Sequence, residues 1–225
     1  MDLLRFPRFY RYPYCHWGKT FISLLADADV ADDANVVDAP CGDGVVTFWL
    51  VKNGVQRSFE LVDLAERDVN RARRLTAWPA ANACDIHVSC GDIHELPLPA
   101  GRTRDIWFLI NSLFLLPNID RLIERMRPRI EHIIGLFPDV NSRNYRCYKK
   151  RNPAMNANEM NREQIGAFFS RHGYVTKKTL DASFIPHHCI QPMRVQQVTR
   201  YALNPFGNLA SKNDPCYWAG LFTRE

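Results

Sequence analysis

The sequence contains no apolar run close to the roughly 20 residues that a membrane-spanning helix requires. Residues 1–10 lack a continuous apolar core followed by a small-residue cleavage site, which argues against a secretory signal. The seven cysteines are an odd number and do not have the spacing of a disulfide framework. We therefore expect a cytoplasmic protein with reduced thiols and no membrane span.

The composition excludes few functions. A length of 225 residues suits one domain with a substantial core, so we expect a single domain over residues 1–225. The chain is 46% hydrophobic and 24% charged, as in ordinary globular proteins. Its net charge of +5 permits attraction to nucleic acid, anionic lipid or an acidic substrate, but requires none of them.

One stretch, residues 35–50, predicts a strand, a glycine turn and a helix start in immediate succession. Val36 and Val37 are β-branched and favour a strand. Gly42 and Gly44 allow backbone angles and close approaches that a side chain would block. From Val45 onward, apolar residues recur at helical spacing. Because amide groups at a helix start are not all used by the helix, we expect a ligand at this turn.

Strands and helices alternate along the rest of the chain, which predicts an open, doubly wound α/β sheet with helices on both faces. Further strands are expected at Ser58–Val62, Asp85–Ser89, Arg104–Ile110, His132–Phe137, Tyr174–Leu180 and Cys216–Thr223. Helices are expected at Lys19–Ala28, Glu66–Trp78, Asn118–Met126 and Glu159–His172. In such a sheet, ligands bind above the carboxyl ends of the strands.

An acid precedes the glycine turn. Asp38 ends the first strand, where a carboxylate would repel a pyrophosphate but would suit a cation. Asp63 follows the second strand. Its separation from Gly44 in the sequence is about that expected between a glycine turn and an acid that binds ribose hydroxyls. The alternative role for Asp63 is a helix cap, because Glu66 follows three residues later in a capping-box arrangement.

Asp38, Gly42 and Gly44 resemble the first motif of the class I S-adenosylmethionine-dependent methyltransferases, Asp-x-Gly-x-Gly-x-Gly, with Pro40 where its first glycine usually stands. The resemblance implies a Rossmann-like, mostly parallel seven-stranded sheet with an antiparallel last strand, and S-adenosyl-L-methionine as cofactor. It also implies that Asp92 accepts from the adenine amino group and that Ile93 packs on the ring. The implied cofactor-binding set is Asp38, Cys41, Gly42, Gly44, Asp63, Leu64, Asp92, Ile93, Asn111 and Ser112.

Three segments outside this core, which spans residues 35–138, are candidates for acceptor binding. Residues 1–34 form an aromatic arm and a helix, in which Tyr14 and Trp17 either cover the site or pack on the outside of the core. Residues 139–158 form a polar cap in which Tyr145 and Arg146 either bind substrate or lie in a solvated loop. A second cap spans residues 183–215.

The proton acceptor, where one is needed, is sought in the second cap. His187 and His188 are the leading candidates because imidazole titrates near neutral pH, and His16 is the third. Any one of these histidines can equally have a structural role. We predict no metal site, because adjacent residues such as His187, His188 and Cys189 rarely ligate one ion.

The sequence thus predicts a methyltransferase that acts on an oxygen or nitrogen of a small molecule, such as a secondary metabolite, a sugar or a lipid precursor. The alternatives are an RNA methyltransferase, suggested by the basic, tyrosine-rich first cap, and an inactive scaffold subunit. The chain lacks the Asn/Asp-Pro-Pro-aromatic tetrapeptide of many base-modifying enzymes and has Asn111-Ser112-Leu113-Phe114 instead, which weakens the RNA prediction. Both a monomer and a homodimer are compatible with the sequence.

Overall fold

The computed structural model describes residues 11–28, 30, 34–77, 84–97, 104–142, 145–146, 159–182 and 217–225. Seven strands within these ranges form one sheet of order β3-β2-β1-β4-β5-β7-β6. They are β1 (Val36–Asp38), β2 (Phe59–Asp63), β3 (Ile86–Cys90), β4 (Asp105–Ile110), β5 (Ile130–Pro138), β6 (Tyr174–Asp181) and β7 (Tyr217–Arg224). Strand β7 is antiparallel to both of its neighbours, whereas the pairs from β3 to β5 are parallel. The predicted fold class is confirmed.

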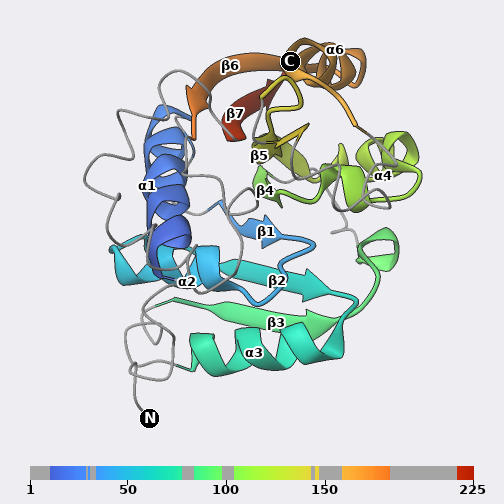
Figure 1. Ribbon diagram of the computed structural model, residues 1–225. Helices are drawn as coiled ribbons and strands as arrows, with labels where there is room; N and C mark the ends of the chain where they lie inside the picture. The colour runs from blue at the N-terminus through green and yellow to red at the C-terminus, as the bar shows by residue number, and fades with distance from the viewer. Residues whose placement is uncertain are drawn as a thin grey trace.

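Helices cover both faces of the sheet (Figure 1). The described helices are α1 (Arg11–Asp27), α2 (Val45–Lys52), α3 (Glu66–Thr76), α4 (Ile119–Met126) and α6 (Arg162–Arg171), with short 3-10 turns η3 (Ile93–Glu95) and η4 (Leu113–Leu115). Helices α1, α2 and α3 pack on one face, and η3, η4, α4 and α6 pack on the other. None of the helices in the described ranges combines the length and the apolar character needed to cross a membrane.

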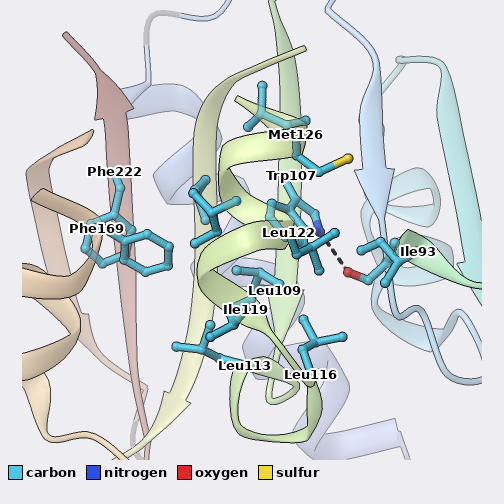
Figure 2. Close-up of a cluster of buried hydrophobic side chains, with 14 of the residues drawn as sticks. Ile93, Trp107, Leu109, Leu113, Leu116, Ile119, Leu122, Met126, Phe169 and Phe222 are labelled. Atoms are coloured by element: carbon cyan, nitrogen blue, oxygen red, sulfur yellow. Dashed lines mark hydrogen bonds between the residues drawn. The ribbon is translucent and has the colours of Figure 1, made fainter. Parts of the chain in front are cut away.

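Alternation along the central strands explains why both faces are covered. Ile106 and Phe108 of β4 point into the core beneath α1 and α2, and Trp107 and Leu109 point into the core beneath α4. All four side chains are fully buried, as expected for strands with helices on both sides. Figure 2 shows the second of these cores, to which η3, η4, α4 and α6 contribute residues together with Trp107 and Leu109.

The start of α1 corrects one prediction. We expected the first helix to begin at Lys19, after an aromatic arm, but it begins at Arg11 and includes Pro13. A proline in the first turn is tolerated, because amide groups there have no partner within the helix. The other predicted elements have the expected type and order, and their ends differ by up to three residues from those observed.

Candidate functional site

A cavity of about 530 Å³ lies at the carboxyl ends of β1, β2, β3 and β4. Its volume falls within the range of about 300–1,000 Å³ that is typical of small-molecule sites. The wall is formed by Trp17, Pro40, Cys41, Gly42, Asp43, Val45, Val46, Val62, Asp63, Leu64, Asp68, Gly91, Asp92, Ile93, His94, Ile110, Asn111, Ser112, Leu115, Leu116 and Pro117. Residues that follow four different strands therefore meet in one space.

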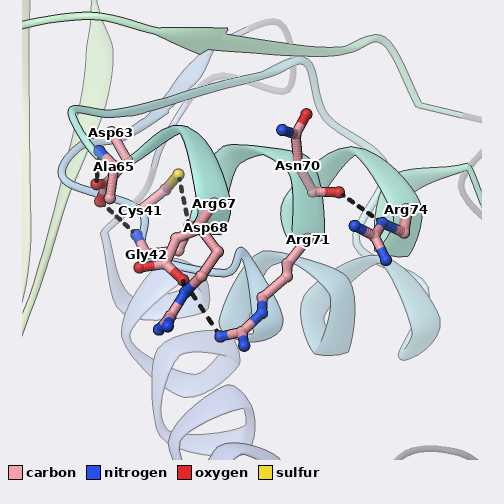
Figure 3. Close-up of polar contacts among 9 residues, drawn as sticks. All are labelled: Cys41, Gly42, Asp63, Ala65, Arg67, Asp68, Asn70, Arg71 and Arg74. Carbon is pink, nitrogen blue, oxygen red and sulfur yellow. Dashed lines mark hydrogen bonds and ion pairs between the residues drawn. The ribbon is translucent and has the colours of Figure 1, made fainter.

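The glycine turn and the acid at the end of β2 hold each other in place (Figure 3). The backbone N–H of Gly42 donates to Asp63 Oδ2 at 2.8 Å, and the N–H of Ala65 donates to Asp63 Oδ1 at 2.9 Å. Each carboxylate oxygen keeps a further lone pair for a ligand donor. The capping-box alternative is wrong, because the N-cap of α3 is Ala65 and no side chain caps this helix.

Two residues of the predicted motif lie behind the turn and do not line the cavity. Gly44 has φ +69°, and a Cβ atom there would lie 3.0 Å from both Ala72 Cβ and Leu61 Cδ2. Asp38 is wholly buried, and its Oδ2 accepts from Thr47 Oγ1 at 2.7 Å. Burial raises the pKa of Asp38 to about 7, against the lowering effect of the Thr47 hydrogen bond. Both residues thus shape the turn from within the core.

The segment after β3 forms a rigid platform beside the cavity. Asp92 caps η3, because its Oδ1 accepts from the N–H of His94 at 2.8 Å. Arg125 of α4 donates to the carbonyl oxygens of Ile93 and Leu96, which fixes η3 to the helix below it. Ile93 is buried, while its neighbour Asp92 is only half-buried. The platform therefore presents a carboxylate next to an apolar surface.

The segment after β4 completes the wall. Asn111 adopts the left-handed backbone region, with φ +53°, and its N–H donates to the carbonyl of Leu136 at 2.8 Å. Ser112 is buried, and its Oγ has no hydrogen-bond partner among the described residues. Buried polar atoms of this kind are rare in proteins and call for an explanation such as a ligand. Beyond Ser112 the wall becomes apolar, through Leu115, Leu116 and Pro117.

Most predicted site residues meet at this cavity. Those lining it are Trp17, Cys41, Gly42, Asp63, Leu64, Asp92, Ile93, Asn111 and Ser112. Tyr145 instead packs in a separate small apolar pocket with Leu113, Phe137 and Ile165, and Arg146 is exposed. Tyr14 belongs to α1, but its side chain lies outside the described part. His16 belongs to α1 too, and its side chain is likewise outside the described part. His187 and His188 fall in residues that the structure does not describe.

Three polar residues of the wall were not predicted: Asp43, Asp68 and His94. Asp43 stands between the two glycines and His94 stands two residues after Asp92, so their positions next to motif residues were the available signal. Burial raises the pKa of Asp43. Asp68 accepts from Arg71 Nη1 at 3.3 Å (Figure 3).

The lining fits a cofactor that offers donors and positive charge. Four carboxyl groups, those of Asp43, Asp63, Asp68 and Asp92, border the cavity. Hydroxyl, amino and ammonium groups are the natural partners of carboxylates. The Cys41 thiol stays protonated, because burial raises its pKa and the Asp38 carboxyl group raises it further. Within the described ranges, no group of three or more His, Cys, Asp or Glu side chains could hold a metal ion.

The sheet with its reversed β7 and the acid-lined cavity at the glycine turn define a Rossmann-like methyltransferase fold. Residues 36–131 match the family model of a methyltransferase domain. No curated protein sequence matches the chain significantly. The chain is therefore similar to methyltransferases in its fold and, over residues 36–131, in its sequence.

Solved structures share this fold at low sequence identity. Magnesium protoporphyrin IX methyltransferase from Synechocystis, with bound SAH, is 15% identical with a TM-score of 0.64, covering 100% of this chain and 89% of that one. A putative methyltransferase in complex with the Trm112 activator from Haloferax volcanii is 15% identical with a TM-score of 0.64, covering 96% and 93%. The [4+2]-cyclase SpnF is 13% identical with a TM-score of 0.65, covering 92% and 81%. At such identities the likeness establishes the fold alone.

Proposed function

We propose that the protein transfers a methyl group from S-adenosylmethionine to an oxygen or nitrogen atom of a small molecule, such as a secondary metabolite, a sugar or a lipid precursor. The observation that carries this proposal is the continuity of the cavity wall. The wall passes from the acids of the cofactor side through Ser112 to the apolar Leu115 and Leu116, with Trp17 of α1 also lining it. Such a wall suits an acceptor with an apolar body.

The bound cofactor supplies a methyl group on a positively charged sulfur. Methyl transfer is an in-line displacement, so the contribution of the protein is alignment of the acceptor and exclusion of water. In our proposal, Asp63 binds the ribose hydroxyls and Asp92 accepts from the adenine amino group. Asp63 is already fixed by two backbone N–H groups, so it loses little freedom when it binds. Leu115 and Leu116 exclude water beside the acceptor.

A proton acceptor is needed only when the acceptor atom carries a proton that must leave. His187 and His188 remain our candidates for this role. Alanine at one of these positions is expected to lower turnover more than cofactor affinity. Wild-type turnover in both single variants would end the assignment.

RNA is the competing acceptor, and the burial of one described aromatic residue argues against it. Base stacking needs an exposed aromatic ring, but Tyr145 of the basic loop is buried against Leu113 and Phe137. The neighbour from Synechocystis is named for a porphyrin acceptor, so this fold can serve small molecules. Another neighbour is a cyclase, so methyl transfer itself has to be measured.

Two assays test the proposal on the purified chain. Calorimetric titration with S-adenosylmethionine and, separately, NADH is expected to show saturable binding of the first alone. The protein is then incubated with S-adenosylmethionine labelled in its methyl group and with either total RNA or an RNA-free metabolite extract. Label in the metabolite fraction that resists ribonuclease supports the proposal, and label in RNA contradicts it. Binding without transfer to either fraction favours the scaffold alternative.

Replacing Asp63 tests the cofactor geometry. Asp63→Asn exchanges one acceptor oxygen for a donor, so the side chain can no longer both receive the two backbone N–H groups and bind two ribose hydroxyls. Loss of charge-assisted hydrogen bonds predicts an increase of about 30-fold in the Kd of S-adenosylhomocysteine, measured by calorimetry. Asp181→Asn is the control, because this exposed acid pairs only with Arg162 in the contacts described. A Kd within about twofold of wild type in Asp63→Asn would remove the ribose assignment.

A further inference from the structure

We propose that His94 is a specificity-determining residue that donates a hydrogen bond from Nε2 to a ring nitrogen of the cofactor's adenine. The inference rests on the cofactor assignment and extends it to a side chain outside the family motifs. His94 lies in η3, the short turn after β3, and borders the cavity together with Asp92 and Ile93.

The backbone around His94 is fixed before any ligand binds. Its N–H donates to Asp92 Oδ1 at 2.8 Å, and Arg125 holds the carbonyl oxygens of Ile93 and Leu96 on either side. A side chain on such a platform has a defined position at the cavity wall. Contacts of this kind cost little ordering entropy on binding.

The imidazole has an unfilled hydrogen-bonding position. His94 Nε2 is shielded from solvent and has no hydrogen-bond partner among the described residues. A buried polar atom without a partner costs about 1–3 kcal/mol. His94 is one of the residues that line the cavity, so a ligand there can supply the missing partner of its ring. A ligand acceptor at this place therefore removes an existing cost.

The position of His94 indicates that it contacts the adenosine half of the cofactor. Asp92 and Ile93, the residues proposed for the adenine amino group and the ring face, immediately precede it in the same turn. With the amino group bound by Asp92, the purine presents ring nitrogens, which are hydrogen-bond acceptors. A neutral imidazole carries one N–H donor, which matches that requirement.

The test compares side chains that differ in reach. His94→Gln places its amide near the position of Nε2, whereas the amide of His94→Asn reaches only as far as Nδ1. His94→Leu removes hydrogen bonding and keeps an apolar side chain of similar bulk. The matched control is His87→Leu, since His87 is exposed on β3 and does not line the cavity. Each variant is titrated with S-adenosylhomocysteine and with methylthioadenosine, which lacks the amino-acid tail, and its melting temperature is measured without ligand.

The Asn and Leu variants are expected to bind both ligands about tenfold more weakly, and the Gln variant to stay within about threefold of wild type. The Leu variant should melt at or above the wild-type temperature, because it removes a buried nitrogen without a partner. The His87 control should bind as wild type does.

Equal affinities of wild-type protein and the Asn variant would overturn the proposal. It would also be overturned by a loss seen with S-adenosylhomocysteine but not with methylthioadenosine, which would put the contact on the amino-acid tail. A lower melting temperature with unchanged affinities would make His94 structural. If wild-type protein bound neither ligand, the cofactor assignment itself would fail, and the two failures are thereby distinguished.

Discussion

Asp38 shows how a motif residue can affect stability through its burial. Its carboxyl group is inaccessible to solvent, and Oδ1 has no partner among the described residues. Burial is the main reason that its pKa rises from 3.8 to about 7, with smaller contributions from Asp63 and Asp43. The ionised form is therefore costly in the free protein, and a cationic group of the cofactor beside the turn would lower that cost.

This raised pKa predicts a specific pH dependence. Because the folded state holds the proton of Asp38 more tightly than the unfolded chain, its contribution to stability is complete below pH about 4 and is lost as the pH rises to about 7. Asp38→Asn stays neutral, so its free energy of unfolding relative to wild type should increase over this range, by at most about 4 kcal/mol. Urea unfolding between about pH 4 and pH 8 measures the difference. Glu95→Gln, at an exposed position, is the control. A flat curve for Asp38→Asn would mean that Asp38 is ionised at low pH in the folded protein.

Single residues of the site were predictable to different degrees. Asp63 and Asp92 could be placed because parallel strands bring their carboxyl ends to one edge, so acids at successive strand ends must lie near each other. The burial of Asp38 could not be predicted, because it depends on which side chains cover the end of β1. His94 was missed because its open hydrogen-bonding position becomes visible only when its surroundings are known.

The glycine turn contains two glycines with left-handed backbones and different surroundings. Gly42 has φ +55° and open space where a Cβ atom would lie, whereas a Cβ atom at Gly44 would press on Ala72 and Leu61. Gly44 therefore sets how closely the start of α2 approaches α3 and β2. The sequence alone indicated the need for glycine at both positions but not this difference between them.

The pair makes a matched test. Gly42→Ala carries only the strain of a left-handed alanine, about 1 kcal/mol. Gly44→Ala carries the same strain plus overpacking, so we expect it to cost about 2–4 kcal/mol in the free energy of unfolding. Urea unfolding of both variants gives the two values. Equal losses would show that α3 moves freely to accommodate the new methyl group.

The limits of helices were less predictable than their existence. Apolar periodicity located α1 from Lys19 onward but not its start at Arg11, since Pro13 is tolerated in the first turn, where its missing N–H is not needed. The C-terminal end of α2 is clearer from local sequence, because Asn53 caps the helix and Gly54 follows with φ +88°. Local sequence thus indicates a helix end where a glycine can adopt the left-handed conformation that other residues avoid.

In the described part of the molecule, two large hydrophobic cores lie on opposite faces of one sheet. Alternating residues of the central strands feed both cores, and this pattern explains why the doubly wound class could be predicted from strand and helix alternation. The ion pairs near the amino-terminal ends of the central strands could not be predicted. They join residues far apart in sequence whose neighbourhood depends on the strand order.

Arg129 is the main example. It precedes β5 and is buried, its Nε donates to Asp105 Oδ2 of β4 at 2.6 Å, and its Nη2 donates to Glu60 Oε2 of β2. Burial lowers the pKa of Arg129, but the hydrogen bonds with the two carboxylates outweigh this effect and the net direction is upward. The guanidinium thus joins the strands on both sides of β1 at the edge opposite the cavity.

Removing the Arg129 guanidinium should leave the Asp105 and Glu60 carboxylates near the core without their positively charged partner. Arg129→Met is expected to cost about 3–5 kcal/mol in the free energy of unfolding. The triple variant with Asp105→Asn and Glu60→Gln should be more stable than the single variant, because the groups left behind carry no charge. Urea unfolding at neutral pH compares them, and calorimetry with S-adenosylhomocysteine should give wild-type affinity for each folded variant, since the triad lies away from the cavity. A triple variant less stable than Arg129→Met would mean that the two acids are stabilised by other partners, and that the sheet edge does not depend on the guanidinium.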